Sequence, residues 1–357
     1  MGILFRVFAI WAALFSGGCE APSSGPGGDQ AEITVVFIPK ITGNAFFEAA
    51  NRGSQEYAAG HGFKVDYRGS PEAVAAHQAA LVEEAVAGRA RAISISALDA
   101  KALDKPLKAA LAAGVKVVTW DSDVAPDARQ LMVSQGTPDQ LGRMLVEMGA
   151  KSLAARGRNP TRARVNYAWH YSQARVTDQN SWHRAGERYI KETYPNWINV
   201  APDNYYSEQN PELAVSVGEA IFAEHPEVDL IICNDSTALP GQAQAAVNRG
   251  LTAKDVTITG FASPNAMRAY CRDGVVERWG LWDCGIQGAL SCYLAYYLAS
   301  NNSFKVGDRV DVPDIGLVEI MPNSVLDPEA PASSKSGVVL LPARLEFTLA
   351  NVDDYDY

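Results

Sequence analysis

Short apolar runs alternate with segments of helical periodicity through the first part of this chain, and no other feature constrains its fold as strongly. The apolar runs have the length of buried strands, and they lie at 33–39, 63–67, 92–96, 115–119 and 131–133. The helical segments between them lie at 44–60, 73–87 and 103–113. Strands that alternate with helices form a parallel, doubly wound sheet with helices on both faces.

The same pattern restarts in the second part of the chain. A helical segment at 140–155 is followed by a strand at 165–169, a helix at 177–194, and strands at 230–233 and 256–260. The sequence therefore predicts an α/β fold with two similar lobes. The facing rims of two such lobes form a cleft, which is a preferred place for a small-molecule site.

Polar side chains follow several of these strands. Lys40 follows the first strand, Asp121 follows Trp120 at the end of the fourth, and Asn234 and Ser236 follow a strand of the second lobe. In open parallel sheets ligands bind at the carboxyl ends of the strands, so these residues are candidates for a binding site. Asp121 and Lys40 also have simpler interpretations, because Asp is common in turns and helix caps, and a lone Lys is usually a solvated surface residue.

The first nineteen residues have the pattern of an export signal. Arg6 supplies the positive charge, Val7 to Phe15 form the apolar part, and small residues precede Cys19. A Cys after two small residues resembles a bacterial lipobox, and lipid on Cys19 would anchor the protein to a membrane. A secretory signal cut near Gly18 is the alternative. Residues 20–31 are rich in Pro, Gly and Ser, which predicts a flexible tether.

Composition excludes several classes of function. The net charge of -10 gives no electrostatic indication of nucleic-acid binding. The length of 357 residues suggests about two domains. The remaining cysteines do not have the spacing of a metal site, and either disulfides or buried free thiols are compatible with them. They are Cys233, Cys271, Cys284 and Cys292. No metal or cofactor is expected.

An ordered set of short motifs gives the chain a resemblance to a known family. The motifs are Phe37-Ile38-Pro39-Lys40, Thr119-Trp120-Asp121-Ser122-Asp123, Gln135-Gly136-Thr137-Pro138, Val176-Thr177-Asp178-Gln179-Asn180, Ala238-Leu239-Pro240, Pro264-Asn265-Ala266-Met267-Arg268, Gly280-Leu281-Trp282-Asp283, Pro322-Asn323-Ser324-Val325 and Val339-Leu340-Leu341-Pro342. Together they resemble the type I periplasmic solute-binding proteins of ABC importers. Among these they are most similar to the autoinducer-2 receptors of the Lsr uptake systems.

This resemblance implies two lobes joined by a hinge, with lobe 1 at 32–134 and 262–305 and lobe 2 at 135–261 and 306–357. It implies a monomeric, non-enzymatic receptor in the periplasm or on the cell surface, which delivers its ligand to an ABC permease in the inner membrane. The expected ligand is autoinducer-2, with rhamnose or another sugar as the alternative.

The resemblance also implies which side chains form the site. Those expected to bind the ligand are Lys40, Asp121, Asp178, Gln179, Asn234 and Ser236, and those expected in the pocket wall are Phe46, Trp120, Trp282 and Asp283. Asn234 and Ser236 stand where the family has proline and alanine, so two apolar contacts become polar. Asp178 has a second interpretation, as the cap of its helix.

Two other classes share parts of this pattern. Asp121-Ser122-Asp123 after an apolar strand resembles the Asp-x-Asp motif of haloacid-dehalogenase-type phosphatases, in which magnesium bridges to phosphate. In those enzymes the motif follows the first core strand, whereas here three strand–helix units precede it. The effector domain of a LacI-type repressor is also two-lobed, but here an export signal stands where its DNA-binding helices would be.

Overall fold

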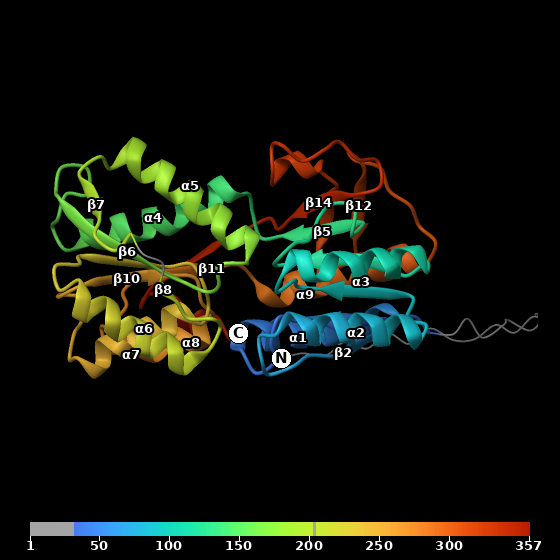
Figure 1. Cartoon of the computed structure of the whole chain (residues 1–357), viewed down its shortest axis with the longest axis horizontal. Helices are drawn as coiled ribbons and strands as arrows, with labels where there is room; N and C mark the ends of the chain where they lie inside the picture. Colours follow the sequence, from blue (N-terminus) through green and yellow to red (C-terminus); the bar gives the residue numbers. More distant parts are fainter. Residues whose placement is uncertain (1–31, 203–204) are drawn as a thin grey trace, which may run out of the picture. The chain divides into compact units, whose positions relative to one another are not determined.

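The computed structural model describes residues 32–202 and 205–357, which form two lobes, each built on a parallel sheet (Figure 1). The expected export signal, Cys19 and the expected tether at 20–31 lie outside the described residues. The α/β fold predicted from the alternating pattern is confirmed.

The first lobe contains a six-stranded sheet in which every neighbouring pair is parallel. Helices α1 (Ala45–His61) and α9 (Cys284–Ala299) pack together, and α2 (Ala75–Ala87) and α3 (Ala100–Ala112) form a second pair. The strands, in their order across the sheet, are β14 (Gly337–Leu340), β5 (Leu131–Ser134), β4 (Lys116–Trp120), β3 (Ala92–Ile95), β1 (Thr34–Ile38) and β2 (Lys64–Tyr67).

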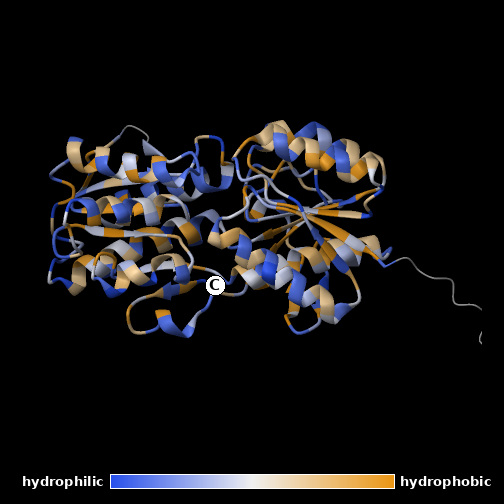
Figure 2. Cartoon of the chain, turned by 90° about the horizontal axis from the view of Figure 1, so that it is seen from below, coloured by the Kyte–Doolittle hydropathy of each residue, from blue (hydrophilic) through white to orange (hydrophobic). Residues whose placement is uncertain are grey.

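Side chains along these strands alternate between the two faces of the sheet, as the pleat requires. Val36 and Ile38 belong to the core that includes α2 and α3, whereas Val35 and Phe37 belong to the core that includes α1. Figure 2 shows the apolar strands of this lobe between helices whose outer surfaces are more polar. Burial on both faces explains why these strands have apolar runs without polar alternation.

The second lobe is a smaller version of the first, with β8 (Tyr205–Tyr206) added beside β6. Helices α4 (Pro138–Ala155) and α5 (Thr177–Thr193) pack together, as do α6 (Pro211–Glu224) and α7 (Ala238–Asn248). Its parallel strands, in order, are β10 (Thr257–Gly260), β9 (Leu230–Cys233), β6 (Val165–Tyr171) and β7 (Trp197–Asn199).

Three connections join the lobes, and they correct the expected boundaries. Helix α8 (Pro264–Arg272) packs against α7, and β11 (Trp279–Leu281) pairs with β15 (Leu345–Phe347), so 262–281 is part of the second lobe and not of the first. The assignment of 306–357 to the second lobe is wrong for β14, which pairs with β5 in the first sheet. The chain therefore crosses between lobes after β5, β11 and β14.

The remaining elements lie near the C-terminus. They are the hairpin of β12 (Arg309–Val312) and β13 (Gly316–Glu319) and the short 3-10 helices η1 (Asn323–Val325) and η2 (Val352–Asp354). Across residues 32–202 and 205–357, no helix combines the length and the apolar character that a membrane crossing requires. The four cysteines after Cys19 are buried free thiols, so of the two interpretations the structure has the second.

Candidate ligand-binding site

Lys40 and Asp121 form a buried ion pair at the carboxyl edge of the first sheet. Lys40 Nζ lies 3.1 Å from Asp121 Oδ2, and these residues are only 3% and 5% exposed. Ser96 Oγ donates to the same carboxylate oxygen at 2.7 Å. The interpretation of Lys40 as a solvated surface residue is therefore wrong.

The backbone at Asp121 is unusual. Its φ of +58° lies in the left-handed region, which Asp tolerates better than most residues. Gln135 Nε2 donates to its carbonyl oxygen at 3.1 Å, which holds this turn against the first interlobe connection. The turn directs the carboxylate away from the strand and towards Lys40.

The electrostatic environment of Lys40 comes from both lobes. Burial opposes its charge, but Asp121, Asp178 and Asp235 outweigh burial, so the pKa of Lys40 is raised above its ordinary value. Lys40 is therefore a permanent cation and hydrogen-bond donor.

Asp178 and Gln179 lie in the first turn of α5. The capping position belongs to Val176, which has no side-chain oxygen, so the interpretation of Asp178 as the helix cap is wrong. Asp178 Oδ2 instead accepts a hydrogen bond from Ser122 Oγ of the first lobe at 3.0 Å. Burial, with a further contribution from the Asp121 charge, raises the pKa of Asp178 to about 7, although Lys40 acts in the opposite direction.

The residues after β9 meet the start of α5. Asn234 Nδ2 donates to the Gln179 carbonyl oxygen at 3.2 Å, and Gln179 Nε2 lies 3.4 Å from Asp235 Oδ2. Asp235 also accepts hydrogen bonds from the first backbone N–H groups of α7, and burial raises its pKa. Ser236 Oγ lies 3.5 Å from Asn44 Oδ1 of the first lobe.

Most of these side chains line a small cavity of about 20 Å³ between the lobes. It brings together Lys40, Asp121, Gln179, Asn234 and Ser236 with two of the expected wall residues, Phe46 and Trp282. The sequence did not single out the other wall residues, which are Phe47, Trp182, Gln209, Asp235, Phe261 and Leu281.

The other two expected wall residues lie elsewhere. Trp120 is fully buried and stacks on Phe37 with ring centroids 4.7 Å apart, so it supports the cavity from behind. Asp283 caps α9 by accepting a hydrogen bond from Ile286 N at 2.9 Å. Neither is among the cavity-lining residues.

The aromatic wall draws on both lobes. The ring of Trp282 lies edge-on to those of Phe46, Trp182 and Phe261, at centroid distances of 5.8, 6.0 and 5.5 Å. Trp282 Nε1 donates to Gln287 Oε1 at 2.6 Å, which satisfies its polar group away from the ligand space. The wall is therefore apolar, and specificity must come from the polar residues opposite it.

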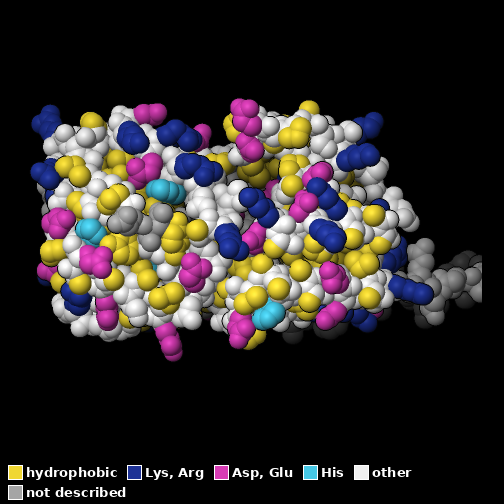
Figure 3. Space-filling view, in the orientation of Figure 1, with side chains coloured by type: hydrophobic (Ala, Val, Ile, Leu, Met, Phe, Trp, Pro, Cys, Tyr) yellow, Lys and Arg dark blue, Asp and Glu magenta, His cyan; other side chains and the backbone are white. Residues whose placement is uncertain are grey.

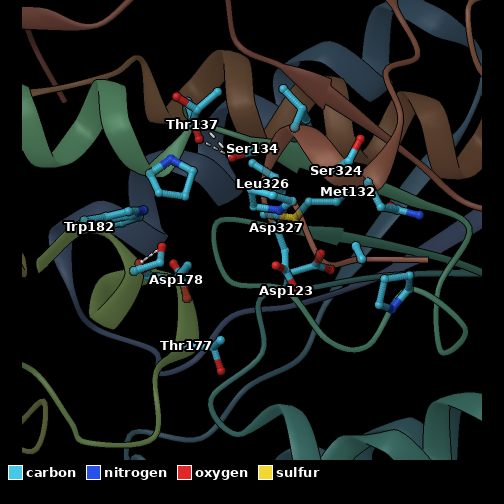
Figure 4. A pocket seen from close by; sticks show the side chains of 18 of the residues that line it. Asp123, Met132, Ser134, Thr137, Thr177, Asp178, Trp182, Ser324, Leu326 and Asp327 are labelled. Atoms are coloured by element: carbon cyan, nitrogen blue, oxygen red, sulfur yellow. Dashed lines mark hydrogen bonds between the residues drawn. The ribbon is translucent and has the colours of Figure 1, made fainter. Parts of the chain in front are cut away.

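A second, larger cavity of about 750 Å³ shares Trp182 with the first. In Figure 4 the side chains of Trp182 and Asp178 extend from α5 on one side, and Asp123, Met132 and Asp327 lie across from them. Figure 3 shows the surface hollowed between the lobes, with charged side chains around the hollow. Asp178, which the resemblance places among the ligand-binding residues, lines this second cavity and is not among the residues that line the first.

The Asp-x-Asp pattern does not form a catalytic pair. Asp121 pairs with Lys40, whereas Asp123 forms a two-point ion pair with Arg129 and accepts a hydrogen bond from Thr119 Oγ1. Arg129 is 2% exposed and also donates to Asn323 Oδ1. Among the described residues, no group of three or more His, Cys, Asp or Glu side chains is placed to hold a metal ion.

Two amide oxygens at the cavity have no hydrogen-bond partner among the described residues. They are Gln179 Oε1 and Asn234 Oδ1, both buried. A buried polar atom without a partner costs about 1–3 kcal/mol, so these oxygens favour a ligand that brings hydrogen-bond donors. Hydroxyl groups are such donors, and carboxylates such as Asp121 accept them as well.

Comparison with known proteins agrees with this geometry. The family model described as "Periplasmic binding protein domain" matches residues 35–303, three quarters of the chain. The chain belongs to the periplasmic binding protein family. It is thus an extracytoplasmic solute-binding protein of an ABC transporter and not an enzyme, as the resemblance predicted.

Solved structures place this periplasmic binding protein more closely. It is 62% identical to LsrB from Clostridium saccharobutylicum in complex with AI-2, with a TM-score of 0.90, over 91% of this chain and all of the other. An ABC transporter solute-binding protein from Clostridium phytofermentas with bound L-rhamnose is 21% identical, with a TM-score of 0.80, over 91% and 98% of the two chains, and shows the fold alone.

The name of a further relative refers to other sugars. The D-ribose/D-allose-binding protein of Pseudomonas aeruginosa is 26% identical over 68% of this chain and 74% of its own length. The likeness to LsrB and the family match confirm the resemblance stated from the sequence motifs.

Proposed function

We propose that this binding protein is a receptor for autoinducer-2, which it takes up in the unborated, hydrated furanone form and delivers to its permease. The observation that carries the proposal is the 62% identity to LsrB in complex with AI-2, over 91% of the chain. The site chemistry supports it, because Asp121, Asp178 and the unpaired oxygens of Gln179 and Asn234 accept hydrogen bonds from hydroxyls.

Lys40 has the complementary role in this proposal. Its ammonium group donates to a ring or hydroxyl oxygen of the ligand while it neutralises Asp121. Charge-assisted hydrogen bonds of this kind are about twice as strong as neutral ones. The apolar face of the furanone would lie against Phe46 and Trp282.

A rhamnose-like deoxysugar is the second candidate. The observation that favours it is the polar character of Asn234 and Ser236, which stand where the resemblance expects proline and alanine. Both residues line the cavity, so either could add a hydrogen bond to a sugar hydroxyl.

Two measurements decide between these ligands. Mass spectrometry of the small molecules released when the purified protein is denatured identifies the ligand that it carries. Calorimetry on ligand-free protein then compares autoinducer-2 with L-rhamnose, D-ribose and D-allose. Tight binding of autoinducer-2 is expected, whereas tight binding of a sugar without response to autoinducer-2 would overturn the ligand and leave the receptor class intact.

Membrane attachment is a separate part of the proposal. We infer that the mature protein begins at Cys19 and carries lipid there, because small residues precede this Cys after an apolar run. We also propose that it is a monomer. Intact mass and N-terminal analysis of the protein extracted from membranes test this. A soluble mature form whose N-terminus lies upstream or downstream of Cys19 would contradict it.

A further inference from the structure

The loop between β8 and α6 has a strained backbone beside the cavity. Glu208 and Gln209 are consecutive residues with φ of +50° and +56°, and neither is Gly, Asn or Asp. Left-handed conformations cost such residues about 1–2 kcal/mol each. Strain of this kind persists only where surrounding structure imposes it, and it is concentrated at functional sites.

The end of β6 holds this loop in place. Ser207 N and Oγ both donate to the Tyr171 carbonyl oxygen, at 2.9 and 3.0 Å, and Glu208 N donates to that of Ser172 at 2.8 Å. On the other side Asn210 caps α6 by accepting from Leu213 N at 2.9 Å. The loop is thus fixed at both ends.

This conformation separates the two strained residues. Glu208 is exposed, whereas Gln209 is 5% exposed and lines the same cavity as Lys40, Asp121 and Gln179. Gln209 Nε2 donates to Ser172 Oγ at 3.1 Å, which sets the orientation of the amide. Within the described part of the chain, no group donates a hydrogen bond to Gln209 Oε1.

We propose that Gln209 is a specificity-determining residue whose Oε1 accepts a hydrogen bond from a hydroxyl of the bound ligand. Gln209 reaches the cavity from the loop between β8 and α6, whereas the other polar side chains come from the first lobe, the start of α5 and the end of β9. The inference rests on the proposed function only in that the ligand carries hydroxyls.

A purely structural role would have different consequences. If Gln209 served only to hold the loop through Ser172, its loss would weaken every ligand equally. A contact to one hydroxyl instead changes the ranking of ligand affinities, because the loss of Gln209 does not weaken an analogue that lacks that hydroxyl. The ratio of affinities is therefore the decisive quantity.

The experiment is calorimetry on the full-length mature protein with autoinducer-2, L-rhamnose, D-ribose and D-allose, and with deoxy analogues of whichever binds tightest. The variants are Gln209→Ala and Gln209→Glu, with Glu208→Ala as a matched control in the same loop. Gln209→Ala should weaken the tightest ligand about tenfold and one deoxy analogue hardly at all. Gln209→Glu, which keeps an acceptor oxygen, should retain that preference, and Glu208→Ala should match the wild type.

The outcomes separate this inference from the proposed function. Equal weakening of the ligand and all its deoxy analogues in Gln209→Ala, or no weakening, overturns the role of Gln209. Wild-type protein that prefers a sugar overturns autoinducer-2 alone, and the Gln209 variants are then measured with that sugar. Wild-type protein that binds none of the panel overturns both. A crystal structure with ligand should place Gln209 Oε1 within about 3.2 Å of a ligand oxygen.

Discussion

In the first lobe the charged groups of the cleft already satisfy one another, whereas in the second lobe two amide oxygens of the cleft have no partner among the described residues. Asp121 pairs with Lys40 and accepts a hydrogen bond from Ser96, both within the first lobe. Gln179 and Asn234 instead use their N–H groups within the protein and leave their oxygens unpaired.

This difference assigns different tasks to the two lobes. A buried ion pair is strongly destabilised when one partner is lost, so the first lobe is sensitive to substitution even without ligand. Unpaired buried amide oxygens cost free energy unless a ligand donates hydrogen bonds to them, so the second lobe makes closure depend on what is bound. Substitutions in the first-lobe ion pair should therefore lower the stability of the protein even without ligand, whereas substitutions at the second-lobe amides should mainly change ligand affinity.

The largest effect is expected for Lys40→Met, which leaves the Asp121 carboxylate buried without a cation. The free energy of unfolding should fall by about 3–5 kcal/mol, and ligand binding should become undetectable. Denaturant titration and calorimetry measure the two effects. Lys101→Met, an exposed lysine of α3, is the control, and a Lys40→Met protein as stable as the wild type would contradict the preformed ion pair.

A smaller effect is expected from pH, through Asp178. A ligand hydroxyl that donates to this carboxylate favours its ionised form, so binding releases a proton when the pH lies below the free-state pKa of about 7. Affinity should therefore fall by up to about tenfold between pH 8 and pH 6. Calorimetry over this range measures the change, which Asp178→Asn should remove.

The groups around Asp178 make the sign of this prediction specific. The charges of Lys40 and Asp121 both act on the pKa of Asp178. The pKa of Lys40 is itself raised by Asp121, Asp178 and Asp235 despite its burial, so Lys40 keeps its charge throughout this range. Affinity that rises as the pH falls to 6 would show that the ligand binds the protonated carboxyl instead.

Removal of the two unexpected polar side chains should have a moderate effect. For autoinducer-2, Asn234→Ala with Ser236→Ala should weaken binding about two- to tenfold, the value of one or two neutral hydrogen bonds. Asn234→Pro is less informative than Ala, because Asn234 N lies 3.4 Å from the His170 carbonyl oxygen and proline has no N–H. If a sugar is the natural ligand, calorimetry should show loss of the sugar and retention or gain of autoinducer-2.

The smallest effect is expected at the surface of the cleft. Arg175 of the second lobe lies 3.4 Å from Asp99 of the first, and its side chain is 80% exposed. Arg175→Ala should lower affinity no more than about threefold, and by less at high salt. Small-angle scattering should still show a compact particle with ligand, whereas loss of ligand-induced compaction would show that this pair drives closure.

Local patterns predicted most of the secondary structure and several of the polar residues that line the cavity. Lys40 and Asp121 were identified because both follow strands that are buried on two faces, where the end of an apolar run is distinct. The return of β14 to the first sheet was missed, because its partner β5 lies some two hundred residues earlier and nothing local encodes that pairing. Gln209 was missed because its place in the cavity depends on backbone angles that no motif encodes.

The left-handed backbone at Asp121 limits how this receptor can change its ligand. Only glycine, asparagine and aspartate adopt that conformation readily, so few residue types can replace Asp121 without backbone strain. Asn234 and Ser236 have no such restriction, since neither has a positive φ. New ligand specificities in this fold should therefore arise by substitutions after β9. The Lys40–Asp121 pair of the first lobe should be retained and should bind each new polyhydroxylated ligand.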